Sequence, residues 1–238
     1  MLIERHVAAK HKLCPLLWAD GVLDETIKGK LLTIAKDFFG DLDIEADIMD
    51  IQLTGSIANY NYTAYSDIDV HIVIDFTEID ENTSLVKMAV DGQRFIWNLR
   101  HNIVIRGHDV ELYVQDQSEP HMSSGVYSLM QDEWIIEPKR LHPITDTADV
   151  ETKYAGYADD ITRLESLSKM KLYPEESKDY YNYTKELKSK IMKARKEGLA
   201  QNGEFSVENL VFKKLRNNGK LEKIIDLTAK FYDMIYAQ

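Results

Sequence analysis

The hydrophobic pattern changes along the chain, and this change limits the folds that are open to it. In the first part, short runs rich in Val and Ile alternate with longer stretches whose apolar residues recur at helical spacing. In the last part, only helical spacing is found. The sequence therefore predicts an α+β domain over residues 1–140, with a small mixed sheet flanked by helices, and a C-terminal helical bundle over residues 150–238.

The individual elements can be placed from the same pattern. The expected helices of the first part are 22–39 and 83–99. The expected strands are 48–53, 68–76, and 102–106 with 109–115 as a strand pair or one bulged strand. The expected helices of the second part are 151–171, 177–197, 206–217 and 220–236. Asp24 is the predicted N-cap of the first helix, and Gly40 is predicted to end it.

Charge is distributed unevenly over the 238 residues, whose net charge is -11. Residues 1–149 carry 12 Lys and Arg against 26 Asp and Glu, a net charge of -14. Residues 150–238 carry 17 against 14, a net charge of +3. Because duplex DNA is bound through phosphate neutralisation, the acidic first part argues against duplex DNA as a partner.

Targeting signals and cysteine usage bear on location. No run approaches the roughly 20 apolar residues of a membrane-spanning helix, and the N-terminus lacks the apolar core of a leader peptide. A single cysteine, Cys14, excludes an internal disulfide framework and suits a reducing compartment. We therefore expect a cytoplasmic protein without a membrane partner, with Cys14 as a small buried residue.

The chemical signal lies in residues 53–74, LTGSIANYNYTAYSDIDVHIVI. Asp67 and Asp69 stand at the start of an apolar strand, where residues two apart point to the same face. Two carboxylates held this close repel each other, and a bound divalent cation relieves the repulsion. Hard oxygen ligands suit Mg²⁺ or Mn²⁺.

The turn that precedes these acids suggests phosphate binding. Gly55 has no Cβ, so its backbone can approach a ligand closely. Ser56 adds a hydroxyl and, if it opens a helix over 57–62, free N–H groups for phosphate oxygens. A phosphate clamp beside a carboxylate pair is what metal-assisted phosphoryl transfer requires.

This combination resembles a known signature. Gly55-Ser56, followed by Ser66-Asp67-Ile68-Asp69 and an apolar strand, is similar to the motif of the DNA polymerase β-like nucleotidyltransferase superfamily. The spacing resembles that of the minimal and antibiotic nucleotidyltransferases. The resemblance implies that the Gly-Ser turn, with Ser66, contacts the triphosphate, and that both Asp residues hold two ions of Mg²⁺ or Mn²⁺.

The same resemblance implies a third carboxylate on a later strand, which completes the metal site and can act as base. Glu111 fits this place, and Asp109 shares its face by the two-residue rule. Glu111 is favoured because it lies deeper in the strand, where an acid is more costly. The expected catalytic and metal-binding set is therefore Asp67, Asp69 and Glu111.

A wider resemblance extends over nearly the whole chain. The segments 17–21, 107–116, 119–129 and 203–213 are similar to nucleotidyltransferase-domain proteins of large tailed bacteriophages. This resemblance implies a location in the host cytoplasm and defines no substrate. One departure is Tyr60-Asn61, where many members of the superfamily have a glycine.

The expected activity is transfer of a nucleoside monophosphate from an NTP, with ATP favoured as donor, to a hydroxyl acceptor with release of pyrophosphate. The acceptor is left open between a small molecule, a protein side chain and an RNA end. Two alternatives remain: a non-catalytic, antitoxin-like binding module on the same fold, and a template-dependent DNA polymerase. The acidic first part disfavours the polymerase.

Several residues allow a functional and a structural interpretation. His71 follows Asp69 by two, so it either borders the site or is a structural histidine. The loop tyrosines 60, 62 and 65 either stack on a ligand or pack locally. Likewise, His121, Ser123 and Ser124 either contact substrate or form a turn. The lysine-rich segment 185–196 is either a solvated helix face or supplies one or two lysines to the triphosphate.

Overall fold

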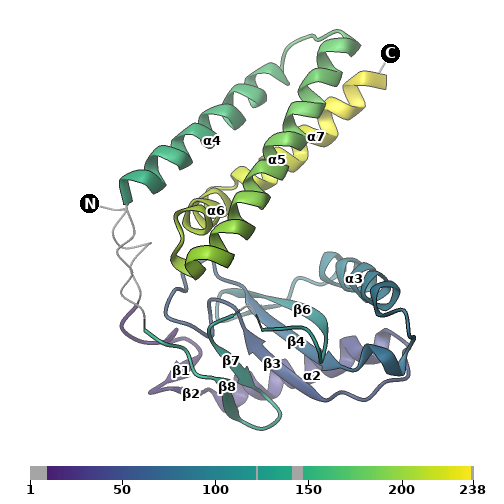
Figure 1. Cartoon of the computed structure of the whole chain (residues 1–238), viewed down its shortest axis with the longest axis vertical. Helices are drawn as coiled ribbons and strands as arrows, with labels where there is room; N and C mark the ends of the chain where they lie inside the picture. Colours follow the sequence, from purple (N-terminus) through teal and green to yellow (C-terminus); the bar gives the residue numbers. More distant parts are fainter. Residues whose placement is uncertain (1–9, 122, 141–146, 237–238) are drawn as a thin grey trace. The chain divides into compact units, whose positions relative to one another are not determined.

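The computed structural model describes residues 10–121, 123–140 and 147–236. Its residues form two compact units, one within 8–142 and the other within 143–238. The first is a mixed sheet flanked by helices and the second is entirely helical, so the predicted α+β class is confirmed (Figure 1). The predicted change of domain between 140 and 150 lies mostly outside the described residues.

The sheet of the first unit has six strands. They are β3 (Asp50–Thr54), β4 (Ile68–Ile74), β5 (Val104–Ile105), β6 (His108–Asp116), β7 (Val126–Ser128) and β8 (Glu133–Ile136). Their order across the sheet is β5-β6-β4-β3-β7-β8. The β4–β6 pair is parallel and the other neighbouring pairs are antiparallel. The strand pair predicted around Gly107 is confirmed as β5 and β6, whereas β7 and β8 were not predicted.

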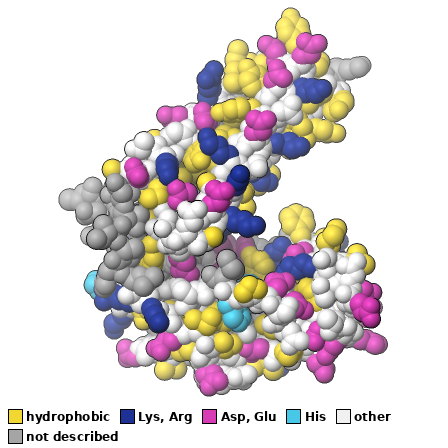
Figure 2. Space-filling view, in the orientation of Figure 1, with side chains coloured by type: hydrophobic (Ala, Val, Ile, Leu, Met, Phe, Trp, Pro, Cys, Tyr) yellow, Lys and Arg dark blue, Asp and Glu magenta, His cyan; other side chains and the backbone are white. Residues whose placement is uncertain are grey.

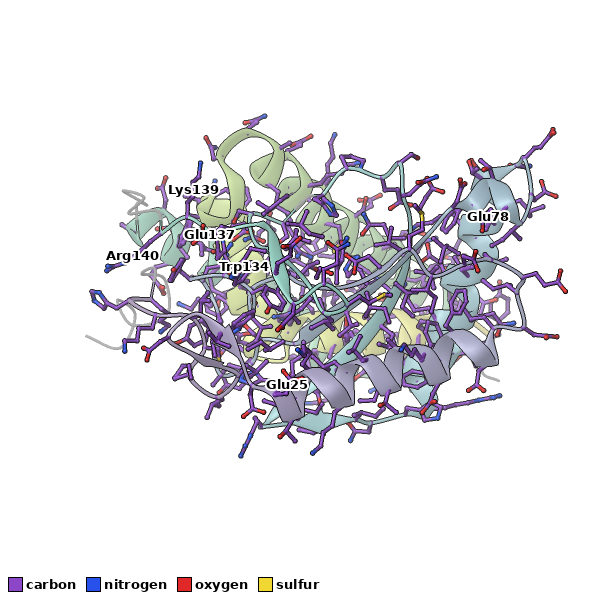
Figure 3. All side chains as sticks on the ribbon, turned by 90° about the horizontal axis from the view of Figure 1, so that it is seen from below. Glu25, Glu78, Trp134, Glu137, Lys139 and Arg140 are labelled. Atoms are coloured by element: carbon purple, nitrogen blue, oxygen red, sulfur yellow. The ribbon has the colours of Figure 1, made fainter. Side chains whose placement is uncertain are left out.

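One helix covers a face of this sheet. Helix α2 (Glu25–Asp41) follows a small hairpin of β1 (Trp18–Ala19) and β2 (Val22–Leu23). Asp24 caps it as predicted, accepting from the N–H groups of its second and third residues at 2.9 and 3.1 Å. The helix does not end at Gly40 as predicted but runs to the next residue. Figure 3 shows α2 along the sheet, with Glu25 in its first turn.

The two faces of the sheet have opposite chemistry, because side chains alternate along each strand. We call the α2 side the apolar face. Its main residues are Ile51, Leu53, Ile68, Val70, Ile72, Ile74, Val110, Leu112 and Val114, which form one core with the buried side of α2. We call the other side the polar face. Its main residues are Asp50, Gln52, Thr54, Asp69, His71, Glu111, Tyr113, Gln115 and Ser128.

Helix α3 (Thr83–Arg100) connects the two parallel strands β4 and β6. Parallel neighbours require such a crossover. The helix also protects the outer edge of β6, where Asn98 binds both the carbonyl and the N–H of Leu112, at 3.3 and 3.4 Å. Lys87 reaches the carbonyl of Val114 at 3.4 Å. Backbone groups that a bare edge would expose are therefore satisfied.

The second unit is formed by four helices. They are α4 (Thr147–Leu167), α5 (Pro174–Asn202), α6 (Val207–Asn217) and α7 (Lys220–Tyr236). The four predicted helices are confirmed, and their buried Ile, Leu, Val and Phe side chains form a core of their own. In the lysine-rich segment, Arg195 lies over the Phe212 ring at 4.0 Å, and the lysines are exposed. Within the described residues, no helix combines the length and apolarity needed to span a membrane.

Candidate active site

Two of the three predicted acids are neighbours at one end of the polar face. Asp69 on β4 is the register partner of Glu111 on the parallel strand β6, and of Thr54 on β3. Neighbouring strands lie about 4.8 Å apart, so these side chains rise from adjacent points of one face. Asp67 stands just before β4 and, like the other two acids, is half-buried. Asp109 is exposed and lies before the first residue of β6 that pairs with β4. We call Asp67, Asp69 and Glu111 the acidic site.

The glycine of the Gly-Ser turn fits against this site. Gly55 follows the last residue of β3 and has a φ of +73°, a conformation that favours glycine. A Cβ added at this position would lie 1.9 Å from Oδ2 of Asp69. The missing side chain therefore gives the Asp69 carboxylate its space beside the turn.

The loop after the turn is held by its own side chains. Ser56 donates from Oγ to Oγ of Ser66 at 2.7 Å, and the same Ser66 oxygen accepts from the N–H of Thr63 at 2.9 Å. The conditional helix over 57–62 does not form, and residues 55–61 are a series of turns. The helix is absent because a side chain competes for its N–H groups. Asn59 Oδ1 accepts from the N–H of Tyr60 at 2.7 Å, and asparagine side chains divert N–H groups from a helix in this way.

His108 also fixes this loop. Nδ1 of the buried His108 donates to the carbonyl of Ser66 at 2.6 Å. Its other nitrogen lies 3.8 Å from Sγ of Cys14. Cys14 is buried as predicted, and burial raises the pKa of its thiol. These contacts hold Ser66, and with it the start of β4, in place.

Tyr113 links the acidic site to the rest of the polar face. Its hydroxyl donates to Oε2 of Glu111, two residues earlier on the same face. Burial, and then the charges of Asp69 and Glu111, raise the pKa of Tyr113 above its ordinary value. The phenol therefore stays protonated and remains a donor. Arg94 of α3, 3.5 Å from Asp91, places its guanidinium 4.7 Å from the centre of the Tyr113 ring.

His71 continues this row away from the acids. Its ring stacks on Tyr113 with 4.7 Å between ring centres, and its Nδ1 lies 2.8 Å from Oε1 of Gln115. Burial lowers the pKa of His71, so the ring is neutral near pH 7. His71 thus both borders the acidic site and is held by structural contacts.

Further along the face, polar groups are buried. Ser128 donates to Asp50 at 2.6 Å, and Gln52 donates to the same carboxylate at 3.1 Å. Within the described part of the chain, Oε1 of Gln52 is buried and has no hydrogen-bond partner. A buried acceptor of this kind is satisfied when a ligand or water supplies a donor.

The other predicted contact residues are placed as follows. Tyr60 and Tyr62 pack against the core, and Tyr65 is exposed. Ser124 accepts from Asn59, Ser123 donates to the carbonyl of Gly125 at 2.9 Å, and His121 is exposed. Tyr113 and Arg94 were not predicted as residues of the site. Tyr113 could have been predicted, because it lies two residues after Glu111 and so shares its face of the strand. Nothing in the sequence around Arg94 indicated that this helical arginine would reach the site.

The donor set can be compared with what a divalent cation needs. The three carboxylates are hard oxygen donors of the kind that Mg²⁺ and Mn²⁺ prefer. The space beside Gly55 keeps one of the carboxylates at the turn. Among residues 10–121, 123–140 and 147–236, no three His, Cys, Asp or Glu side chains are grouped as a preformed metal site.

Fold and site together define an α+β protein whose mixed sheet carries paired carboxylates beside a Gly-Ser turn. No family model matches the chain, and the searches of curated proteins and of solved structures give no match either.

Proposed function

We propose that the chain is a metal-dependent nucleotidyltransferase with the fold of the DNA polymerase β-like superfamily. It would transfer a nucleoside monophosphate, with ATP as the favoured donor, to a hydroxyl acceptor and release pyrophosphate. The observation that carries this proposal is the register of Asp69 with Glu111, beside a glycine whose Cβ would collide with Asp69. Carboxylates with a purely structural role need not lie side by side at a turn, whereas metal-assisted phosphoryl transfer requires carboxylates next to a phosphate-binding turn.

Electrostatics support a divalent cation as the cofactor. Asp69 and Glu111 are register partners at one end of the sheet, and Asp67 directly precedes β4, in the part of the chain whose net charge is negative. A triphosphate is an anion, so it would be repelled from the bare site. Two ions of Mg²⁺ or Mn²⁺, held by Asp67, Asp69 and Glu111, would neutralise the triphosphate and lower the pKa of the acceptor hydroxyl.

The remaining residues would position the reactants. The Gly55-Ser56 turn would lie along the triphosphate, with Ser56 and Ser66 as its hydroxyl partners. The acceptor oxygen forms a bond to the α-phosphorus, and the bond from that phosphorus to the bridging oxygen of pyrophosphate breaks. The acceptor's proton passes to a carboxylate oxygen of Glu111, whose orientation Tyr113 fixes.

The test uses each NTP labelled at the α-phosphate, with Mg²⁺ or Mn²⁺ and host extract as the source of acceptors. Wild type is compared with Asp69→Asn, Glu111→Gln and Asp109→Asn. We expect label transfer to fall at least about 10³-fold in the first two variants, because each removes a metal-binding charge. Asp109→Asn removes an equal charge two residues from Glu111 and should retain activity.

Two results would reject the proposal. Absence of transfer from every donor, together with no heat of Mg²⁺ or Mn²⁺ binding in calorimetry, would favour a non-catalytic binding module. Retained transfer in Asp69→Asn would show that the activity does not depend on this site. The size of the labelled product would distinguish a small molecule, a protein and an RNA end.

A further inference from the structure

Helix α3 is apolar on two opposite sides. One side buries Val86 and Val90 against the sheet unit. The other side exposes five large apolar residues, which are Leu85 (55% exposed), Met88 (74%), Phe95 (65%), Ile96 (42%) and Leu99 (76%). Together they expose on the order of 500 Å², as much as the largest patch of a typical monomer, and such patches mark interaction sites. Figure 2 shows hydrophobic side chains gathered over α3.

We call these five residues, with Gly92, the outer stripe. Four of its positions are symmetric about Gly92: Leu85 and Leu99 lie seven residues to either side of it, and Met88 and Ile96 lie four residues to either side. Steps of four and seven return to the same side of an α-helix. When two copies of α3 run antiparallel and cross at Gly92, the residues of these two pairs therefore face one another, and Phe95 faces the small, exposed Ala89.

Gly92 itself supports a crossing point. It lies in the interior of the helix with a negative φ, and a Cβ added to it would have no atom within 4 Å. Neither backbone conformation nor a contact within the described chain accounts for a residue that weakens a helix. A missing side chain at the centre of the stripe does allow a second helix to approach closely.

Charge at the ends of α3 fits the same arrangement. Asp80 and Glu81 precede the helix and are exposed, whereas Arg100 and His101 end it and are exposed. In an antiparallel pair, the acidic start of one helix lies at the basic end of the other. This complementarity occurs at both ends and favours the antiparallel pair over a parallel one, in which like charges would meet.

We propose that the outer stripe binds a second copy of this chain, giving a two-fold homodimer in which the two α3 helices run antiparallel across Gly92. A two-fold interface uses the same patch on both subunits, which is what a symmetric stripe provides. The buried area from both copies is about 1,000 Å², at the lower limit of specific interfaces, so the dimer forms reversibly with concentration. This proposal does not depend on the nucleotidyltransferase activity.

The experiment is sedimentation velocity of the full chain over a concentration series, whose mass should rise from 27.5 kDa toward twice that value. Gly92→Glu places two like charges at the two-fold axis, and we expect the dissociation constant to rise at least about 10-fold. Because the position is open and glutamate favours a helix over glycine, the melting temperature should not fall. Gly29→Glu, at an equally open and exposed helical glycine on α2, is the matched control and should leave the dimer unchanged.

A charge reversal tests the direction of the two helices. Arg100→Glu should weaken the dimer, because it places an acid opposite Glu81 of the other copy. The double variant Glu81→Arg/Arg100→Glu should restore the dimer, because opposite charges then face each other again at both ends. A wild type that stays at the monomer mass at every concentration overturns the proposal. So does a dimer that Gly92→Glu and Gly29→Glu affect equally, which would place the interface elsewhere.

Discussion

The two faces of the six-stranded sheet are made by the same strands and do different things. The apolar face carries aliphatic side chains that are almost fully buried beneath α2. The polar face carries carboxylates, amides, hydroxyls and an imidazole, and the acids of the acidic site are only half-buried. The burial that stabilises the fold and the polar groups that could carry chemistry therefore lie on opposite sides of the same strands, so substitutions on the two faces should have separate effects.

Adjacent residues of β6 give the largest separation. Glu111 is on the polar face and Leu112, fully buried, is on the apolar face. Glu111→Gln should lower nucleotidyl transfer about 10³-fold with a change in unfolding free energy within about 0.5 kcal/mol. Leu112→Ala should cost about 2–5 kcal/mol of unfolding free energy through lost burial and a cavity.

Urea unfolding and initial rates measure this pair. The rate of Leu112→Ala, divided by its folded fraction, should equal that of wild type. If instead Glu111→Gln unfolds the protein, or Leu112→Ala loses activity while folded, the two faces are not independent and the comparison fails.

Tyr113→Phe should have the next largest effect. It removes the hydroxyl that donates to Glu111 and leaves the ring that stacks on His71. Partners of metal ligands typically contribute about 10–100-fold to metal affinity or activity. We expect a loss of this size, together with a higher Mg²⁺ concentration for half-maximal rate. Tyr127→Phe is the control, because its hydroxyl binds Asp132 at 2.7 Å on the other face.

Gly55→Ala tests whether backbone and site are coupled. The left-handed φ of +73° should cost alanine about 1–2 kcal/mol of unfolding free energy, and the new Cβ would displace the Asp69 carboxylate. Gly107→Ala carries the same backbone penalty at a φ of +85°, with no atom within 4 Å of the new Cβ. Both variants should lose similar stability in urea, but only Gly55→Ala should lose activity. Equal activity in the two would show that the space beside Gly55 is unimportant.

Much of this arrangement could be predicted from local pattern. The apolar pattern placed Asp69 at the start of one strand and Glu111 within a later one, as the strands β4 and β6 have them, and Asp24 was correct as a cap. The register of Asp69 with Glu111 could not be predicted, because it depends on the crossover through α3 and not on local spacing.

Other features were missed for different physical reasons. Strands β7 and β8 are three and four residues long, which is too short for an alternation of apolar and polar residues to be recognised. The conditional helix over 57–62 is absent because the Asn59 side chain binds the N–H of Tyr60. Amphipathicity predicted α3 but not that most of its large apolar side chains face outward, since a helical period does not say which side is buried.

The smallest expected effect concerns Asp116, a carboxylate of the apolar face. Burial raises its pKa, but hydrogen bonds from the hydroxyl and N–H of Ser118 and from the N–H of Phe76 outweigh burial, so the pKa lies below the ordinary 3.8. A lowered pKa means that the ionised form stabilises the fold above about pH 4 and that this stability is lost as pH falls through the lowered value. Asp116→Asn should therefore cost about 1 kcal/mol near pH 7, and the difference from wild type should shrink in acid. Ser118→Ala, which removes one of these donors, should show a smaller loss of unfolding free energy near pH 7 in urea, and this loss should also shrink in acid. A difference that stays constant with pH would mean that packing, and not charge, keeps this acid on the apolar face.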